Sequence, residues 1–212
     1  MSKKFKIAIR NGRRFTGIFI IAFLFQLVEL SGQLSAHLYL GVTLSNYSTR
    51  LYDRAYHERF KQYYKYAPLF NFGLSLNKSI DHYEITTGVG INQRGYRDYL
   101  PPPFVNGEYL LSESTFLEIP FLYTYRTHYF KNKLGIGGGI LYNCRLHAGE
   151  HVYGEEEFGF DIKALLDIKL SKRFKTEFTF TFGNFDKILR NKRMQYVHYI
   201  YGLNLVYKFM EI

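Results

Sequence analysis

Side chains that could perform catalysis gather in a predicted connection at residues 145–157 and in, or directly after, a neighbouring connection at residues 93–113. They are histidines, carboxylates and hydroxyls: His147, Glu150, His151, Glu155, Glu156, Glu157, Ser112 and Ser114. A serine nucleophile, a histidine base and an orienting carboxylate are the parts that acyl hydrolysis needs. Nothing in their spacing requires such a group, so a lipid-modifying hydrolase is an alternative and not the leading hypothesis.

The same residues do not make a convincing metal site. His147 and His151 are four residues apart, a spacing that brings two ligands together on a helix, whereas a loop or strand end is expected here. The acidic run at 155–157 could bind calcium weakly, but such runs are usually solvated loops. We therefore predict no catalytic residue, no metal site and no cofactor.

A second group of charged residues recurs at alternate positions within several predicted strands, opposite the apolar positions. Its members are Glu84, Glu118, Arg126, Asp161, Lys163, Asp167, Lys169, Lys175 and Glu177. Carboxylates that are removed from water need partners, so we predict a network of ion pairs that fills the interior of the fold. We expect Glu118 to pair with one of five cations, namely Arg126, Arg145, Lys163, Lys169 and Lys175. A path for protons or ions is the functional alternative.

These positions are set by eight stretches in which apolar side chains occupy every second position. The stretches are 38–44, 70–76, 83–91, 117–125, 134–142, 158–170, 174–182 and 197–209. A period of two predicts strands with one apolar face and one polar face. The polar parity also carries many glycines, which relieve crowding inside a narrow barrel and allow strands to bend.

The connections between these stretches alternate in length. Short links at 77–79, 130–133 and 171–172 alternate with long links at 46–66, 93–113, 145–157 and 184–193. Short turns at one end and long loops at the other are typical of outer-membrane barrels. We therefore predict an all-β fold, an eight-stranded antiparallel up-and-down transmembrane β-barrel. The remaining fold alternative is a soluble lipocalin-like barrel, whose apolar parity would face inward around a ligand.

The N-terminal segment has the order of a secretory signal peptide. Residues 3–14 are basic, residues 15–28 are mostly apolar, and small residues follow. We predict a signal peptide at 1–33 and a barrel domain at 34–212, with cleavage after Gln33 or Ala36. An uncleaved N-terminal anchor is the alternative.

Composition supports a membrane barrel and argues against nucleic-acid binding. Aromatic residues make up 19% of the chain, with 20 Tyr, 20 Phe and no Trp, as expected for interfacial aromatic girdles. The net charge is +10, but residues 1–33 carry six Lys or Arg against Glu29, so half of it lies in the predicted signal peptide. The remaining cations are scattered and not clustered on one surface. One cysteine excludes an intramolecular disulfide.

The most specific run in the chain is Phe116–Arg126, which contains Leu117-Glu118-Ile119-Pro120. It resembles the "LEIP" strand of the PorT-like outer-membrane β-barrel family of Bacteroidota, and the glycine-rich stretch 134–139 matches the strand that follows there. The resemblance extends in layout over 34–212. It implies an eight-stranded barrel in the outer membrane of a Gram-negative bacterium, in a family named after a component of type IX secretion. Because proline cannot donate to a ladder, Pro120 also predicts a bulge or irregularity.

The leading hypothesis is a non-enzymatic barrel of the bacterial outer membrane, with a lumen filled by side chains. Its role is structural or interactive in the cell envelope, with an accessory role in secretion included. The expected partners are outer-membrane lipid and lipopolysaccharide, the barrel-assembly machinery, which would recognise the terminal strand that ends near Phe209, and envelope or secretion proteins. The aromatic links 46–66 and 93–113 would either bind a partner or simply extend the barrel above the membrane.

Overall fold

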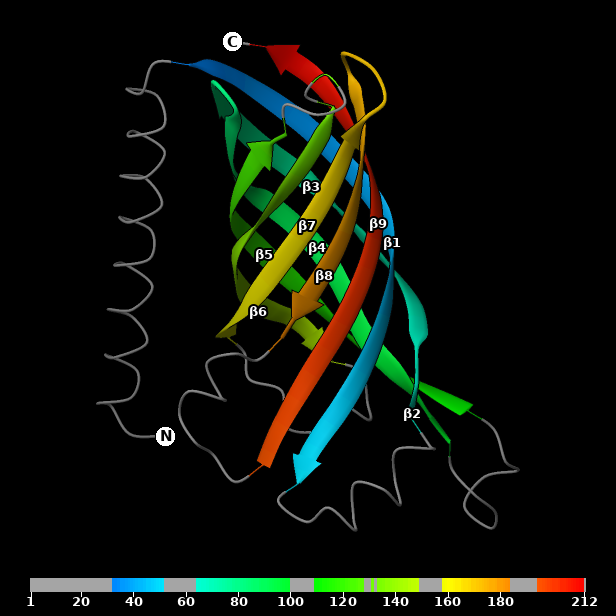
Figure 1. Ribbon diagram of the computed structural model, residues 1–212. Coiled ribbons are helices and arrows are strands. Elements are labelled where there is room, and N and C mark those ends of the chain that lie inside the picture. Colours follow the sequence, from blue (N-terminus) through cyan, green and yellow to red (C-terminus); the bar gives the residue numbers. More distant parts are fainter. Residues whose placement is uncertain are drawn as a thin grey trace.

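Figure 1 shows the computed structural model of the chain, which describes residues 32–51, 64–99, 109–127, 131, 133–148, 158–183 and 194–211. The strands are β1 (Gln33–Leu51), β2 (Tyr64–Lys65), β3 (Ala67–Ile80), β4 (Tyr83–Tyr99), β5 (Tyr109–Arg126), β6 (Leu134–Ala148), β7 (Phe158–Lys169), β8 (Phe174–Phe182) and β9 (Met194–Glu211). No helix within these ranges is long and apolar enough to cross a membrane. The predicted signal peptide, 1–33, lies outside the described residues except for Gly32 and Gln33.

Eight of these strands form a closed antiparallel ring, which confirms the predicted up-and-down barrel. Each long strand pairs with the next long strand along the chain, from β1–β3 to β8–β9. The ring closes because β1 also pairs with β9, from Ser35↔Glu211 to Leu51↔Met194. The short strand β2 pairs with β4 beyond the end of β3. In Figure 1 the start of β1 and the C-terminus lie at the same end of the barrel.

The apolar parity faces outward in all eight long strands. In β1, for example, Leu40 is 61% exposed and Val42 is 50% exposed, whereas Thr43 and Ser45 on the opposite parity are buried inside. A lipocalin-like barrel needs the opposite arrangement, with apolar side chains around an internal ligand. The soluble alternative is therefore wrong for this chain.

The strands run further into the predicted long links than the apolar alternation suggested. β1 continues to Leu51, β4 to Tyr99 and β6 to Ala148, and β5 already begins at Tyr109. The alternation fades there because both faces of a strand meet water beyond the lipid, whereas backbone pairing continues without it. Residues 52–63, 100–108, 149–157 and 184–193, the rest of those links, lie outside the described residues.

Pro120 interrupts one ladder, as its missing N–H predicts. Pairing between β4 and β5 stops at Thr87↔Phe121 and resumes at Gly90↔Glu118 in the same register. True register shifts occur elsewhere, between Thr115 and Phe116 in the β5–β6 pair and at the start of β1. The irregularity at Pro120 is therefore a local gap in hydrogen bonding and not a bulge.

Glycines on the inward parity make room for one large side chain, Tyr39 of β1. A Cβ added at Gly90 would collide with the Tyr39 hydroxyl, and one added at Gly73 would lie 2.6 Å from the same oxygen. At both positions the added Cβ would lie closer to the hydroxyl oxygen than Cβ atoms lie to their neighbours in folded proteins. The narrow interior of an eight-stranded barrel thus accepts a tyrosine only because its two neighbours lack side chains.

We predict that Gly90→Ala destabilises the barrel by about 1–3 kcal/mol, the usual cost of adding atoms to a packed interior. The measurement is the free energy of unfolding in urea for protein folded into lipid vesicles. Adding Tyr39→Phe should recover part of the loss, because it removes the hydroxyl that the new Cβ meets. Equal losses with and without the hydroxyl would show that this contact does not set the cost.

Candidate functional site

Two layers of ion pairs cross the barrel interior, and the first is centred on Arg94 of β4. Its guanidinium lies 2.6 Å from a Glu118 oxygen and 2.6 Å from an Asp161 oxygen. Asn92 donates to Glu118 at 2.7 Å, and Asn143 donates to Asp161 at 2.5 Å. All five side chains are buried. This Arg94 layer ties together β4, β5, β6 and β7 across the lumen.

An aromatic ring supports the same arginine. The guanidinium carbon of Arg94 lies 4.4 Å from the centre of the Phe116 ring, which is buried inside the barrel. A cation over a ring face is attracted by the ring quadrupole, more strongly when both groups are desolvated. Phe116 therefore fills the lumen beside the charges without adding an unpaired polar group.

The second layer is centred on Arg126 of β5 and Lys175 of β8. Arg126 bonds both Asp167 and Glu84, the latter at 2.8 Å. Lys175 lies 2.9 Å from Glu84 and 3.0 Å from Glu177, and its ammonium is 3.8 Å from Asp167. Two cations thus share three carboxylates within this Arg126 layer. Each carboxylate touches at least one cation, which is the condition for keeping ionised groups in an interior.

Lys163 lies between the two layers and acts electrostatically on Glu118 of one and Glu177 of the other. The cavity that borders these three side chains has a volume of only about 20 Å³, about enough for one water molecule. Leu122, Leu141 and Leu165 line the same cavity and pack together. Side chains therefore fill the middle of the lumen.

The structure brings seven of the nine predicted network residues into ion pairs: Glu84, Glu118, Arg126, Asp161, Asp167, Lys175 and Glu177. Among the described residues, Lys163 and Lys169 form no ion pair. Lys163 stands between the layers, and Lys169 is exposed at one end of the barrel.

The predicted partner of Glu118 was wrong. Its ion-pair partner is Arg94, which was not among the five candidates, because β4 does not end in a loop after residue 92 but continues as a strand to Tyr99. Asn92 and Arg94 share the inward parity of Gly90. Polar residues at these alternate positions indicated that the strand continues. This indication was missed because 93–113 was predicted to be a loop.

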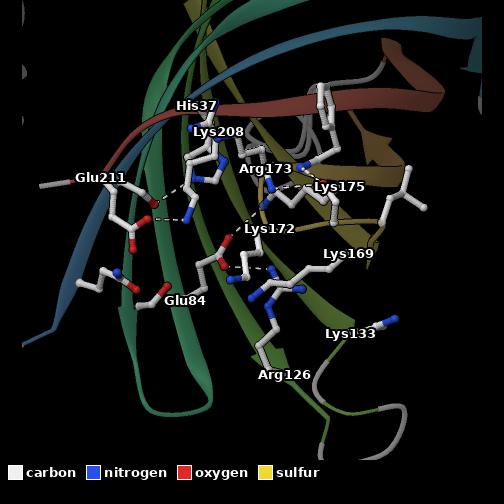
Figure 2. Close-up of a pocket in the computed structure, with 16 residues that line it drawn as sticks. His37, Glu84, Arg126, Lys133, Lys169, Lys172, Arg173, Lys175, Lys208 and Glu211 are labelled. Carbon is white, nitrogen blue, oxygen red and sulfur yellow. Dashed lines mark hydrogen bonds and ion pairs between the residues drawn. The ribbon is translucent and has the colours of Figure 1, made fainter.

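Beyond the Arg126 layer, the interior opens into a cavity of about 730 Å³ at the end that carries the short turns. We call it the mouth cavity. Its floor contains Glu84, Arg126 and Lys175, and its rim contains further lysines and an arginine around the same hollow (Figure 2). The lining residues are Gln33, Ser35, His37, Ser79, Glu84, Arg126, Lys133, Lys169, Leu170, Ser171, Lys172, Arg173, Phe174, Lys175, Lys208 and Glu211.

The hydrolase candidates do not assemble where the structure describes them. Ser114 is buried inside the barrel, and the neighbouring Thr115 pairs with His147, which is exposed. Paired residues share a face, so Ser114 and His147 lie on opposite faces of the wall. Glu150, His151 and 155–157 lie outside the described residues. Within the described ranges, no group of three or more His, Cys, Asp or Glu could hold a metal ion.

The outer wall decides the environment of the barrel. Toward the short-turn end, Tyr83 stacks on Tyr123 at 5.3 Å between ring centres, and Phe174 meets Tyr207 at 5.0 Å. Leucine, valine and phenylalanine follow along the exposed wall. A second aromatic group then includes the pairs Tyr142–Phe160, Phe182–Tyr199 and Phe180–Tyr201. The chain is an outer-membrane β-barrel. An apolar belt between two aromatic girdles, around a closed ring with a polar interior, belongs in the bacterial outer membrane.

In outer-membrane barrels the short turns are periplasmic, so the mouth cavity faces the periplasm. No family model and no curated protein matches the chain. Three similar solved structures are those of Neisserial surface protein A, OprG from Pseudomonas aeruginosa and Ail from Yersinia pestis bound to a heparin analogue. Their identities are 11%, 12% and 12%, with TM-scores of 0.46, 0.43 and 0.40. The matches cover 83%, 84% and 84% of this chain and 99%, 98% and 100% of theirs.

We predict that Arg94→Met destabilises the folded barrel by about 3–5 kcal/mol, because it leaves Glu118 and Asp161 buried without their cation. Combining it with Glu118→Gln and Asp161→Asn should recover at least half of the loss, since no buried charge then stays unpaired. Urea unfolding in lipid vesicles, followed by circular dichroism, gives both values.

Arg97→Met is the matched control for this series, because Arg97 lies on the same strand and is exposed. It should change the free energy of unfolding by less than about 0.5 kcal/mol. If the triple variant is no more stable than Arg94→Met alone, pairing of charge is not what Arg94 contributes.

Proposed function

We propose that the protein is a non-enzymatic scaffold of the outer membrane whose lumen is a plug and not a pore. In this proposal the barrel anchors two interaction surfaces, one at the external ends of the strands and one at the periplasmic mouth. Its role is structural or interactive within the envelope, and we include an accessory role in secretion.

The observation that carries this proposal is the filling of the lumen. Four cations and five carboxylates lie across the interior: Arg94, Lys163, Arg126 and Lys175 with Glu84, Glu118, Asp161, Asp167 and Glu177. A water-filled pore would leave these groups solvated, whereas here most are buried and bonded to one another. A barrel whose interior is filled by such contacts is rigid and offers no route for solutes.

The PorT-like family is part of the proposal, and the structure gives its sequence motif a physical meaning. Within Leu117-Glu118-Ile119-Pro120, Glu118 points inward to Arg94, while Pro120 is buried at the gap in the β4–β5 ladder. The two residues therefore fix a charge and a break in pairing at adjacent inward positions. These two structural roles support membership of the family independently of the overall layout of the strands.

The partners proposed from the sequence are outer-membrane lipid and lipopolysaccharide, the barrel-assembly machinery, and envelope or secretion proteins. The exposed apolar wall between the aromatic girdles suits lipid. The terminal strand β9 suits recognition by the assembly machinery, because it pairs with β1 to close the ring. The long ends of β1, β4 and β9 beyond the belt suit a protein partner.

We predict that the purified full chain in planar lipid bilayers shows no steady ion conductance between −100 and +100 mV, because its lumen is filled. A general porin in the same bilayers provides the positive control for insertion and recording. Discrete, reproducible channel openings of this chain in a majority of insertions would contradict the plug.

We expect no release of fatty acid when the folded protein is incubated with phospholipid and lipopolysaccharide in detergent, because the serine and histidine of the described wall face opposite sides. Mass spectrometry of the lipids provides the readout. Turnover that Ser114→Ala and His147→Ala both abolish, while Arg97→Ala leaves it intact, would make the hydrolase the better proposal.

To test the interaction role, a tagged full chain is crosslinked in the source bacterium and its partners are identified by mass spectrometry. We expect a small set of envelope proteins that is lost when the barrel is replaced by an unrelated outer-membrane barrel carrying the same tag. An identical partner set for both barrels would contradict a specific role in interaction.

A further inference from the structure

The mouth cavity has a charge imbalance that the fold itself does not use. Seven Lys or Arg side chains line it, against two glutamates, Glu84 and Glu211. Both glutamates are already engaged, Glu84 by Arg126 and Lys175 and Glu211 by Lys208 at 2.7 Å. Of the cations in the lining, four have no carboxylate partner among the described residues: Lys133, Lys169, Lys172 and Arg173.

These four cations come from neighbouring parts of the periplasmic end. Lys133 precedes β6, Lys169 ends β7, and Lys172 and Arg173 form the turn between β7 and β8. Register holds them together, since Lys169 pairs with Lys175 and its amide bonds the Lys133 carbonyl at 2.8 Å. Figure 2 shows these four side chains among those that line the cavity, together with Arg126 and Lys175.

Like charges in one concave site repel, and an anion relieves that repulsion. Arg126 and Lys175 act on Lys169 as like charges, whereas Glu84 and Asp167 act on it as opposite charges. Asp167 and Glu177 lie next to the floor of the cavity. When these two carboxylates are counted with the lining, seven cations stand against four carboxylates, which gives a net charge of +3. A cleft with low-dielectric walls and one sign of charge concentrates counter-ions from solution. A single monovalent anion would not balance this charge.

We propose that the mouth cavity binds a small anion carrying two or more adjacent phosphate groups, either free in solution or as a lipid headgroup. The volume of about 730 Å³ lies in the range of small-molecule sites, about 300–1,000 Å³. Lysine ammonium groups and an arginine fork are the side chains that bind phosphate oxygens best. Ser79 also lines the cavity and offers a neutral donor. It rests on the interaction role proposed above for the periplasmic mouth and names the ligand class, whereas the binding test below is read separately from the set of crosslinked partners.

The test uses full-length folded protein in a non-ionic detergent and titrates inorganic pyrophosphate by calorimetry in 150 mM salt. We expect saturable binding with one site per chain. Lys169→Gln combined with Arg173→Gln should weaken it at least tenfold. A matched control removes the same charge elsewhere: Lys131→Asn, at an exposed turn outside the cavity lining, with Arg97→Gln at the other end. The control should bind within twofold of the unmodified chain.

Two further arms identify the source of the phosphates and the class of anion. A detergent-solubilised lipid with a diphosphate headgroup should compete with pyrophosphate if the site accepts a lipid headgroup. It should not compete if the site accepts only an anion free in solution. Either result is consistent with a phosphate-binding site, once pyrophosphate itself binds. A polyglutamate peptide is titrated in the same way, as an anion without phosphate. The proposal is wrong if pyrophosphate shows no saturable binding, if the control variant loses as much pyrophosphate affinity as the cavity variant, or if only the peptide binds. Circular dichroism of each variant checks that the barrel is folded.

Discussion

Closure of the backbone ring is the constraint on which the rest of this structure depends. Lipid offers no hydrogen-bonding partner to a strand edge, so each strand that crosses the membrane must pair on both sides. The β1–β9 pairing satisfies the last open edge along almost the full length of both strands. Closing only eight strands then fixes a narrow interior that side chains must fill.

That narrow interior explains the arrangement of charge and glycine. Tyr39 enters the lumen because Gly73 and Gly90 leave it room. Arg94 and Arg126 each cross the lumen to carboxylates on other strands. Ion pairs in such a place contribute little net stability when compared with apolar packing, but they strongly penalise any register that separates the partners. We regard this selection of one register as what the two charge layers supply.

The sequence was enough to divide each strand into an apolar and a polar face, because strict alternation leaves only two parities. It favoured lipid on the apolar face but left the soluble alternative open, and the exposure of side chains such as Leu40 and Val42 excluded that alternative. The sequence was not enough to name charge partners, because pairs such as Lys175 and Glu84 are 91 residues apart and meet only through ring closure. Arg94 was missed for a local reason: the apolar half of the pattern ends before the strand does. The mouth cavity could not be predicted, since it depends on how the periplasmic ends of several strands, among them β1 and β9, come together with the connection between β7 and β8.

The central claim is that apolar side chains face lipid while the opposite parity is packed dry inside. Nuclear magnetic resonance on the unmodified chain in lipid nanodiscs tests it through contacts of assigned methyl groups. We predict cross-peaks from Leu40, Val42 and Leu203 to lipid acyl chains, and none from Thr43 or Leu141 to lipid or bulk water. Cross-peaks from the Thr43 and Leu141 methyl groups to bulk water would contradict the filled lumen, and cross-peaks from them to acyl chains would contradict the assigned faces.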